Sequence, residues 1–350
     1  VFADYARNWG TNGIVIDSNG LNYQTQDDTY DVEYGTDGTA LHIVYSGATN
    51  GWIPTLDKAV ADVPSKGNTE GIIGYGASNG SGLVSMTNLI SNAGVVSSDV
   101  TGVGTARRDL AACEYGGDKG IFGYGDSGSI VSMTNLVSNA GVVSSDVTGV
   151  GTAREQLAAC EYGGDKGIFA YGTTGSVVSM SNLVTNAGVV GSDVTGVGTA
   201  RRYLAACEFG SDKGIFGYGT TGSNVSMTNL VSNAGVVASD VTGVGTVRNA
   251  PAACGYGGDK GIFGYGEPST AITNLVSNTG VVASDTTGVG TTRSHLAACE
   301  YDEDKGIFCE GYDVSGVTGE TNLVSNAGVV SSDVSVVGTP RVSLGGCSFN

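Results

Sequence analysis

Aspartate and arginine recur at fixed places in this 350-residue chain, and they are the first side chains to test for chemistry. In each of six repeats an Asp stands eight residues before an Arg. Six copies of one charged pair cannot all serve a single off-axis catalytic centre. We therefore expect a structural role, with each Arg fork paired to an acidic or backbone acceptor where repeats meet. A central ring of arginines that binds an anion is the alternative. The pairs are Asp99 and Arg107, Asp146 and Arg154, Asp193 and Arg201, Asp240 and Arg248, Asp285 and Arg293, and Asp333 and Arg341.

Cysteine recurs in the same way, six residues after each Arg. Equivalent residues of neighbouring repeats usually lie too far apart for a disulfide bridge, which needs Cα atoms within about 7 Å. No CxxC motif or paired histidine accompanies them, so a metal ring is the weaker interpretation. We expect free, buried thiols. They are Cys113, Cys160, Cys207, Cys254, Cys299 and Cys347, and Cys309 is the odd seventh.

Single-copy catalytic side chains are scarce. The chain has two histidines, His42 and His295. They are too few to favour a histidine-activated nucleophile or the copper site of an oxidase. SSDVTG (Ser97–Gly102) is a near miss to the Asp-box of sialidases, but its glycine lies one residue late and no Trp follows. We expect no enzyme, no cofactor and no metal site, with a sialidase-like hydrolase as the weakest alternative.

The six repeats differ most at the two residues that follow each Arg. The loop between GYG and TN is also the place where they differ in length, as in ASNGSGLVSM (Ala77–Met86) and EPSTAI (Glu267–Ile272). In an up-and-down sheet both segments emerge on the same face, whereas the GGDK and SNAG loops of the other face hardly change. The alternative is that the sequences of loop tips vary because nothing constrains them, but such variation should affect the exposed loops of both faces. We predict a variable ligand-binding face with these candidates: Arg108, Asp109, Glu155, Gln156, Arg202, Tyr203, Asn249, Ser294 and His295.

These side chains must be positioned by a repeated all-β unit of 45 to 49 residues. The landmark, which reads GIIGYG, GIFGYG, GIFAYG or GIFCEG, begins near residues 71, 120, 167, 214, 261 and 306. The first repeat has four apolar runs that read as strands, GIIGYG, VSMTNLIS, GVVSSDVTGV and LAACEYG. A period of this length with four short strands is typical of propeller blades. We predict a six-bladed β-propeller of four-stranded antiparallel blades over residues 71–350, in which the C-terminal strand completes the first blade.

The first 56 residues are unlike the repeats and hold both tryptophans, Trp9 and Trp52. Strands are expected at Gly13–Gln24, Tyr30–Gly35 and Ala40–Gly47, between Asn-Gly and Asp-Gly turns. Residues 1–56 are therefore predicted to form a small β leader that attaches the protein elsewhere. Residues 57–70, with a Pro and mixed charge, are predicted to be a linker.

Composition excludes some partners. The net charge of −18 repels polyanions, so we expect no nucleic-acid partner. No apolar run approaches the roughly 18 to 20 residues that cross a bilayer, so no membrane span is expected. Asn79 and Asn224 stand in sequons, a weak signal for glycosylation.

TARRDLAACEYGGDKGIFGYG (Thr105–Gly125) resembles a kelch repeat, with an Arg after a turn, a small-residue strand, a Gly-Gly turn and an apolar strand that ends in glycines. It differs from the kelch pattern because it lacks the tryptophan that kelch repeats carry near their end. GIFGYG and NLVSNAGVVSSDVTGVGTAR also resemble repeats in structural proteins of tailed phages, on tail or appendage proteins. That resemblance implies a place on a virion surface or another extracellular location.

Together these observations favour a non-enzymatic recognition protein, a phage tail-fibre or appendage component whose variable face binds a host-surface glycan or protein. The alternative is a structural subunit of an extracellular filament or virion, with the propeller as surface decoration. In both interpretations the leader contacts other subunits, and we expect a homo-oligomer.

Overall fold

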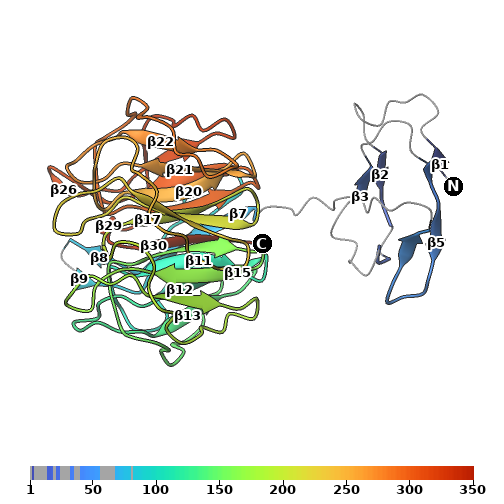
Figure 1. Cartoon of the computed structure of the whole chain (residues 1–350), viewed down its shortest axis with the longest axis horizontal. Coiled ribbons are helices and arrows are strands. Elements are labelled where there is room, and N and C mark those ends of the chain that lie inside the picture. The colour runs from blue at the N-terminus through green and yellow to red at the C-terminus, as the bar shows by residue number, and fades with distance from the viewer. Residues whose placement is uncertain are drawn as a thin grey trace. The chain divides into compact units, whose positions relative to one another are not determined.

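The computed structural model describes residues 2–3, 14–18, 21–23, 32–34, 40–55, 68–79 and 82–350. These residues form strands and no helix, which confirms the all-β class (Figure 1). The chain divides into two compact units, Val1–Lys66 and Gly67–Asn350. Residues 57–67 of the predicted linker lie outside the described residues. Its last three residues differ from the prediction, because Thr69 is hydrogen-bonded to Asn350 and Glu70 begins a strand of the second unit.

The described residues of the first unit form three two-stranded pairings, β1 with β4, β2 with β3, and β5 with β6. Its apolar cluster gathers Tyr23, Val32, Tyr34 and Leu41, and the phenol oxygens of Tyr23 and Tyr34 lie 2.8 Å apart. Trp52 packs against this cluster, whereas Trp9 lies outside the described residues. The strands are β1 (Phe2–Ala3), β2 (Ile14–Ile16), β3 (Val32–Tyr34), β4 (Ala40–Leu41), β5 (Ile43–Tyr45) and β6 (Trp52–Pro54).

In the described part of the second unit each repeat has one main antiparallel sheet, and two smaller sheets lie in the loops. Written in chain order, the five sheets after the first are β11 (Ala111–Tyr115), β12 (Lys119–Gly123) and β13 (Thr134–Val137); β14 (Ala158–Tyr162), β15 (Lys166–Ala170) and β16 (Ser181–Val184); β17 (Ala205–Phe209), β18 (Lys213–Gly217) and β19 (Thr228–Val231); β20 (Ala252–Tyr256), β21 (Lys260–Gly264) and β22 (Thr273–Val276); and β23 (Ala297–Tyr301), β24 (Lys305–Cys309), β27 (Glu320–Val324) and β28 (Val334–Ser335).

The first sheet joins the two ends of this unit. It consists of β10 (Thr87–Ile90), β7 (Glu70–Gly74) and the C-terminal strand β30 (Gly345–Phe349), in that order. β30 runs antiparallel to β7, with Gly345 opposite Gly74 and Phe349 opposite Glu70. The predicted pairing of the last strand with the first repeat is confirmed. It covers the edge of β7, which would otherwise present unpaired backbone groups.

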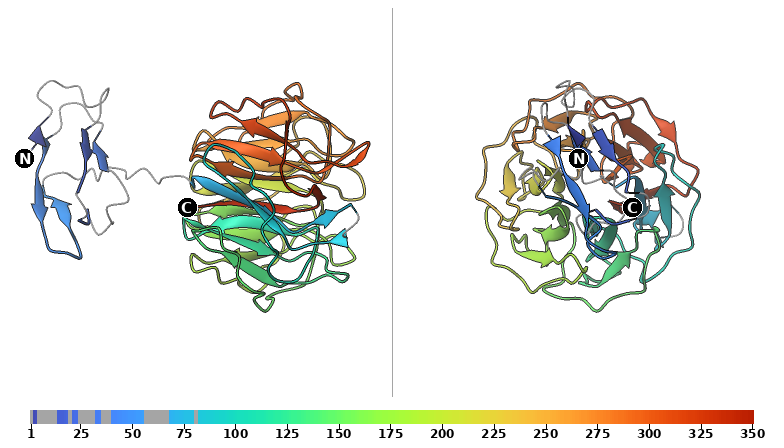
Figure 2. Two further views of the ribbon diagram at one scale, coloured as in Figure 1. Left: turned by 180° about the vertical axis from the view of Figure 1, so that it is seen from behind. Right: turned by 90° about the vertical axis from the view of Figure 1, so that its right-hand side faces the viewer.

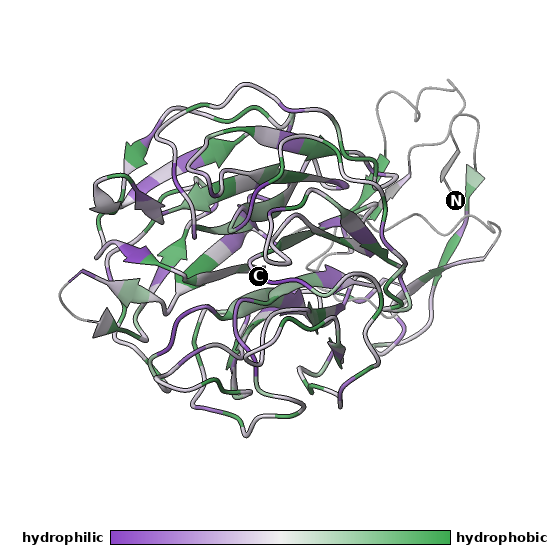
Figure 3. Cartoon of the chain, turned by 60° about the vertical axis from the view of Figure 1, so that its left-hand side comes forward, coloured by the Kyte–Doolittle hydropathy of each residue, from purple (hydrophilic) through white to green (hydrophobic). Residues whose placement is uncertain are grey.

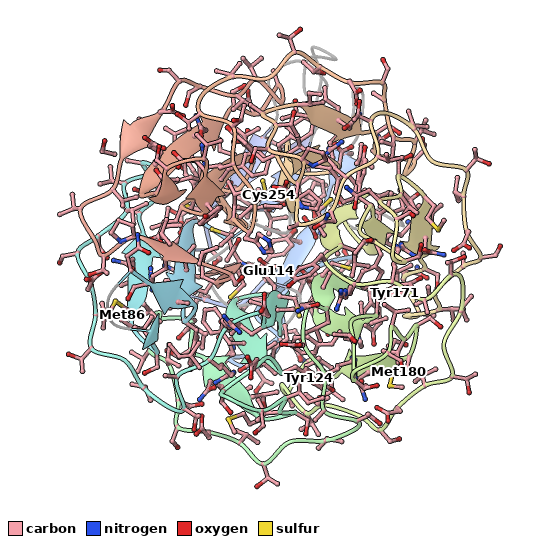
Figure 4. All side chains as sticks on the ribbon, turned by 90° about the vertical axis from the view of Figure 1, so that its left-hand side faces the viewer. Met86, Glu114, Tyr124, Tyr171, Met180 and Cys254 are labelled. Atoms are coloured by element: carbon pink, nitrogen blue, oxygen red, sulfur yellow. The ribbon has the colours of Figure 1, made fainter. Side chains whose placement is uncertain are left out.

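The first strands of the six sheets follow one another in a cycle. β11 contacts β30 and β14, the contacts continue through β17 and β20 to β23, and β23 contacts β30 again. Figure 2 shows these sheets around a common centre. In Figure 4 Glu114 and Cys254 lie near that centre, Tyr124 and Tyr171 farther out, and Met86 and Met180 farther still.

The second strand of each sheet is buried on both faces. In β12, for example, Ile121 and Phe122 are both fully buried. Such a strand reads as a continuous apolar run because a neighbouring sheet covers each face. The first strands instead alternate, as in β11, where Ala111, Cys113 and Tyr115 are buried and Glu114 is partly exposed. Figure 3 shows the hydrophobic residues distributed along these strands.

The prediction of four-stranded sheets holds only for the last repeat, where β28 pairs with β27. In the other repeats the expected fourth strand is reduced to isolated bridges, such as Thr87 with Val100 and Ile90 with Val96. In the first repeat, side-chain groups take part in the hydrogen bonding between these two bridges. The backbone N–H of Leu89 donates to Ser97 Oγ at 2.9 Å, and the Ser97 carbonyl accepts from Asn88 Nδ2 instead.

Short pairings occupy the loops that vary between repeats. β8 (Ala77–Ser78) pairs with β9 (Gly82–Leu83) and with β29 (Arg341–Val342), and β25 (Tyr312–Asp313) pairs with β26 (Gly316–Val317). No helix in the described part of the chain has the length and hydropathy that crossing a bilayer requires.

Candidate functional site

The recurring Asp and Arg side chains make their contacts inside the second unit. Asp146 accepts hydrogen bonds from the Thr105 N–H and hydroxyl and from Asn135 Nδ2, at 3.1, 2.7 and 3.0 Å. Arg107 is fully buried, donates to Asn135 Oδ1 at 2.7 Å and lies over the Tyr75 ring at 4.3 Å. One carboxylate, one guanidinium and one amide therefore connect consecutive repeats.

The same carboxylate contact is made in every repeat and closes the cycle. Thr339, near the C-terminus, donates to Asp99 of the first repeat at 3.0 Å. Burial raises the pKa of Asp99, but hydrogen bonds from Thr339 and Asn88 outweigh it and hold that pKa below its usual range. The other equivalents show the same lowered pKa with the same causes: Asp146, Asp193, Asp240, Asp285 and Asp333.

The recurring cysteines are free and buried. Each thiol lies against the first glycine of a GIIGYG or GIFGYG segment in the next sheet. A Cβ at Gly120 would lie 2.4 Å from Cys347 Sγ, and one at Gly167 would lie 2.6 Å from Cys113 Sγ. Burial raises the pKa of these thiols, for example that of Cys113. They are packed between sheets and kept neutral, so they are unsuited to nucleophilic chemistry.

The two variable segments of each repeat lie side by side, as predicted for one face. Arg108 bridges to Asp126, Glu155 to Thr173, Arg202 to Thr220, Asn249 to Glu267 and Ser294 to Tyr312. In each bridge the residue after the recurring Arg meets the residue that follows GYG or its equivalent. In the first repeat β29 and β8 make the same pairing, with Val342 opposite Ala77.

A closed ring of backbone hydrogen bonds lies next to these bridges. The N–H of Asp109 donates to the carbonyl of Ser343, Gln156 to Asp109, Tyr203 to Gln156, Ala250 to Tyr203, His295 to Ala250 and Ser343 to His295, at 2.7 to 3.1 Å. One residue of each repeat takes part. All six have φ between 49° and 57°, the left-handed region that non-glycine residues rarely adopt. Strained backbone of this kind is concentrated at functional sites.

A pocket of about 410 Å³ opens at this ring. Six of the predicted ligand-binding residues line it: Arg108, Asp109, Glu155, Gln156, Tyr203 and His295. The ring of Tyr203 meets His295 edge-on, with centroids 5.0 Å apart. Variable positions that are far apart in the sequence are therefore brought to one place by the cyclic order of the sheets.

The pocket carries more carboxylates than cations. Arg108 lies 3.3 Å from Asp126 and 3.6 Å from Asp109. Burial raises the pKa of Asp109, and burial together with the charges of Asp109 and Asp126 raises the pKa of Glu155. Burial lowers the pKa of His295, although Asp109 opposes that shift, so the imidazole favours its neutral form.

Three predicted ligand-binding residues do not line the pocket. Arg202 is exposed and lies over the Tyr203 ring at 5.6 Å, and Asn249 donates to Asn224 Oδ1 at 2.9 Å. Ser294 is 1% exposed, so its side chain does not face a surface ligand. The pocket also takes in Asp126, Tyr312, Val342 and Ser343, which are absent from the predicted set. Asp126 and Tyr312 each follow the last glycine of the landmark, and this shared position could have identified them as pocket residues from the sequence.

Below the ring, a narrow channel of about 40 Å³ is lined by the first strands and holds the carboxylates of Glu114, Glu161, Glu208 and Glu300. Burial and mutual repulsion raise the pKa of Glu208 to about 7 and raise those of Glu161 and Glu300. Glu114 is held by the Ser348 N–H at 2.7 Å. Within the described residues no group of three or more His, Cys, Asp or Glu side chains is placed to hold a metal ion.

Comparison with known proteins finds no family model and no curated protein that matches this chain. The site must therefore be interpreted from its own geometry.

Proposed function

We propose that the second unit is a six-bladed, kelch-like β-propeller. The cyclic order of the first strands, the pairing of β30 with β7 and the contact of Thr339 with Asp99 all support closure of one ring. The small departures from the repeat, such as the bridged fourth strand, leave that cycle intact.

The propeller is a non-enzymatic recognition module that binds a host-surface glycan or protein through its variable face. One observation carries this proposal: residues that differ between repeats, including Arg108, Glu155 and Tyr203, converge on a single pocket. Pockets of about 300–1,000 Å³ with a few polar groups among aromatic ones are typical of ligand sites. A place on a phage tail fibre or appendage rests on the resemblance of the repeats to such proteins, with the leader contacting other subunits.

A second function, as a structural subunit of a virion or filament, is favoured by a different observation. One valine of each SNAGVV-type loop is 60% to 66% exposed, although these loops hardly differ between repeats. Apolar groups repeated around an exposed surface are suited to contacts with other subunits. They are Val95, Val142, Val189, Val236, Val281 and Val329.

The test is a glycan array, together with a host-cell binding assay, on the full chain and on Tyr203→Ala. Ala250 already occupies the equivalent ring position with φ of 49°, so this variant should fold with a stability change within about 0.5 kcal/mol. We expect binding to weaken in Tyr203→Ala and to persist in Lys119→Ala, which changes the GGDK loop at the other end of the sheets.

Equal binding by Tyr203→Ala and the unchanged chain would reject the variable face as the recognition surface. If Trp52→Ala abolished attachment at the same time, the leader would be the interaction module and the structural-subunit function would be preferred.

A further inference from the structure

The pocket at the backbone ring has an excess of hydrogen-bond acceptors and of negative charge. Three carboxylates, Asp109, Asp126 and Glu155, line the pocket with one cation, Arg108, whose guanidinium is already shared between the two aspartates, and the charge of Arg202 reaches Glu155 from outside the lining. Among the described residues no hydrogen bond or ion pair engages the Glu155 carboxylate. The side chain of Asp109 is only 9% exposed, so water compensates little of its charge.

Gln156 adds a second observation, independent of the carboxylates. Its Oε1 is buried and has no hydrogen-bond donor within the described part of the chain. A buried acceptor without a partner costs about 1–3 kcal/mol, so it is normally satisfied by water or by a ligand. This oxygen belongs to a residue that lines the same pocket. A ligand that brings donors and positive charge would pair with the carboxylates, and rotation of the Gln156 side chain into the pocket would bring its buried oxygen to a donor of the same ligand.

We propose that this pocket binds an amino sugar with a free, protonated amine, held by the carboxylates of Asp109 and Glu155 and by the amide oxygen of Gln156. The inference rests on the recognition function proposed above and names its ligand class. An ammonium group has three N–H donors and no acceptor, which suits a pocket of this composition.

The size and aromatic lining favour a sugar over a lone lysine side chain. A volume of about 410 Å³ exceeds what one ammonium group fills, and Tyr203, His295 and Tyr312 offer rings beside the polar groups. Tyr312 is 47% exposed, so its ring is accessible at the surface. An aromatic face against the apolar side of a sugar, with carboxylates around its amine, uses every part of the lining.

The experiment measures binding of the full chain to a short oligosaccharide of glucosamine and to its fully N-acetylated counterpart. It is done at about pH 6, because the oxygen substituents next to a sugar amine lower its pKa below that of lysine and even below that of an α-amino group. Because the net charge of −18 attracts any cation, a short lysine oligopeptide measures the nonspecific component. We expect the glucosamine oligomer to bind and both other ligands to bind at least about tenfold more weakly, a difference of about 1.4 kcal/mol.

Two charge-removing variants locate the site. Asp109→Asn suits the left-handed backbone, and Glu155→Gln changes a position that holds Asn in another repeat, so both should keep the fold. Each should weaken glucosamine binding at least about tenfold. Glu303→Gln, which removes one carboxylate from the turn at the far end of β23, should leave binding unchanged and controls for net charge.

The inference would be overturned by no binding of the glucosamine oligomer, by equal binding of the N-acetylated oligomer, or by equal binding of the lysine peptide with the same sensitivity to both variants. Binding that Glu303→Gln weakens as much as Glu155→Gln would do so as well. The recognition function is judged separately. If another glycan or protein binds and Tyr203→Ala weakens it, recognition stands and only the ligand class fails.

Discussion

Glu310 and Arg341 form a buried ion pair, with the Glu310 Oε1 and Arg341 Nη2 atoms 3.1 Å apart and both side chains 0% exposed. In the five other repeats the residue equivalent to Glu310 is a tyrosine, and its ring lies under the next arginine, as Tyr265 lies under Arg293 at 4.5 Å. The ion pair stands where the last repeat meets the first. There it replaces a cation–π contact by a contact between full charges.

Glu310→Gln should lower the free energy of unfolding by about 3–5 kcal/mol, because it leaves the buried Arg341 charge without its partner. Glu310→Tyr restores the side chain of the other five repeats and should cost clearly less. Urea unfolding of both variants measures the difference. The ion pair would have no special role at this junction if the two variants were equally stable.

Ending the chain at Gly338 should abolish soluble, cooperative folding. The truncation removes β30, which exposes the edge of β7, and it also removes the Thr339 contact with Asp99. A chain that begins at Gly67 is the matched control, because it keeps the whole second unit and should stay soluble. A folded, soluble truncation at Gly338 would rule out the closed ring.

Acid should destabilise the second unit through the recurring aspartates. Their folded-state pKa lies below the unfolded value, so their stabilisation is present above an unfolded pKa of about 3.9 and is lost as pH falls through the folded value. Urea midpoints measured between about pH 2 and pH 5 should therefore fall with pH. Asp146→Asn should flatten this dependence. An unchanged slope in Asp146→Asn would contradict the assignment.

The channel glutamates should act in the opposite direction. Their folded-state pKa is raised, to about 7 for Glu208, so the folded state holds protons that the unfolded state has released. Stability is fully present below the unfolded pKa of about 4.3 and falls as pH rises through about 7. Glu208→Gln should be more stable than the unchanged chain at about pH 8 and should lose this slope. A variant that is less stable there would show that the ionised carboxylate is well compensated.

Native thiol labelling should modify few or none of the cysteines, because all seven are buried and burial raises the pKa of their thiols. Mass spectrometry after labelling in buffer, with urea-unfolded protein as the control, counts the modified residues. Rapid labelling of all seven in the folded state would mean that the sheets separate easily.

The sequence predicted the strand order and the closing strand because the repeats begin with the segment GIIGYG and end with SLGGCSFN, the equivalent of LAACEYG. The last strand is therefore the one that the first repeat lacks. It also predicted that variable positions share a face. It could not predict the pocket, because convergence at the centre depends on the cyclic packing of six sheets. It treated Ser294 and His295 as one variable pair, but Ser294 is buried and only His295 lines the pocket. The four-stranded sheet was overpredicted because the apolar content of a segment does not show how much of it pairs with its neighbour, and in the first repeat the pairing is limited to the bridges of Thr87 with Val100 and Ile90 with Val96.

The left-handed backbone of the ring also limits which amino acids can occupy its six positions. Positive φ crowds a branched Cβ, so Val, Ile and Thr should be excluded at all six ring positions. The residues found there are Asp, Gln, Tyr, Ala, His and Ser, none of them β-branched. Only backbone atoms form the hydrogen bonds of the ring. Each position can therefore take any of the permitted residue types without loss of these hydrogen bonds. New specificities can therefore arise one repeat at a time, drawn from polar and aromatic groups and not from branched aliphatic ones.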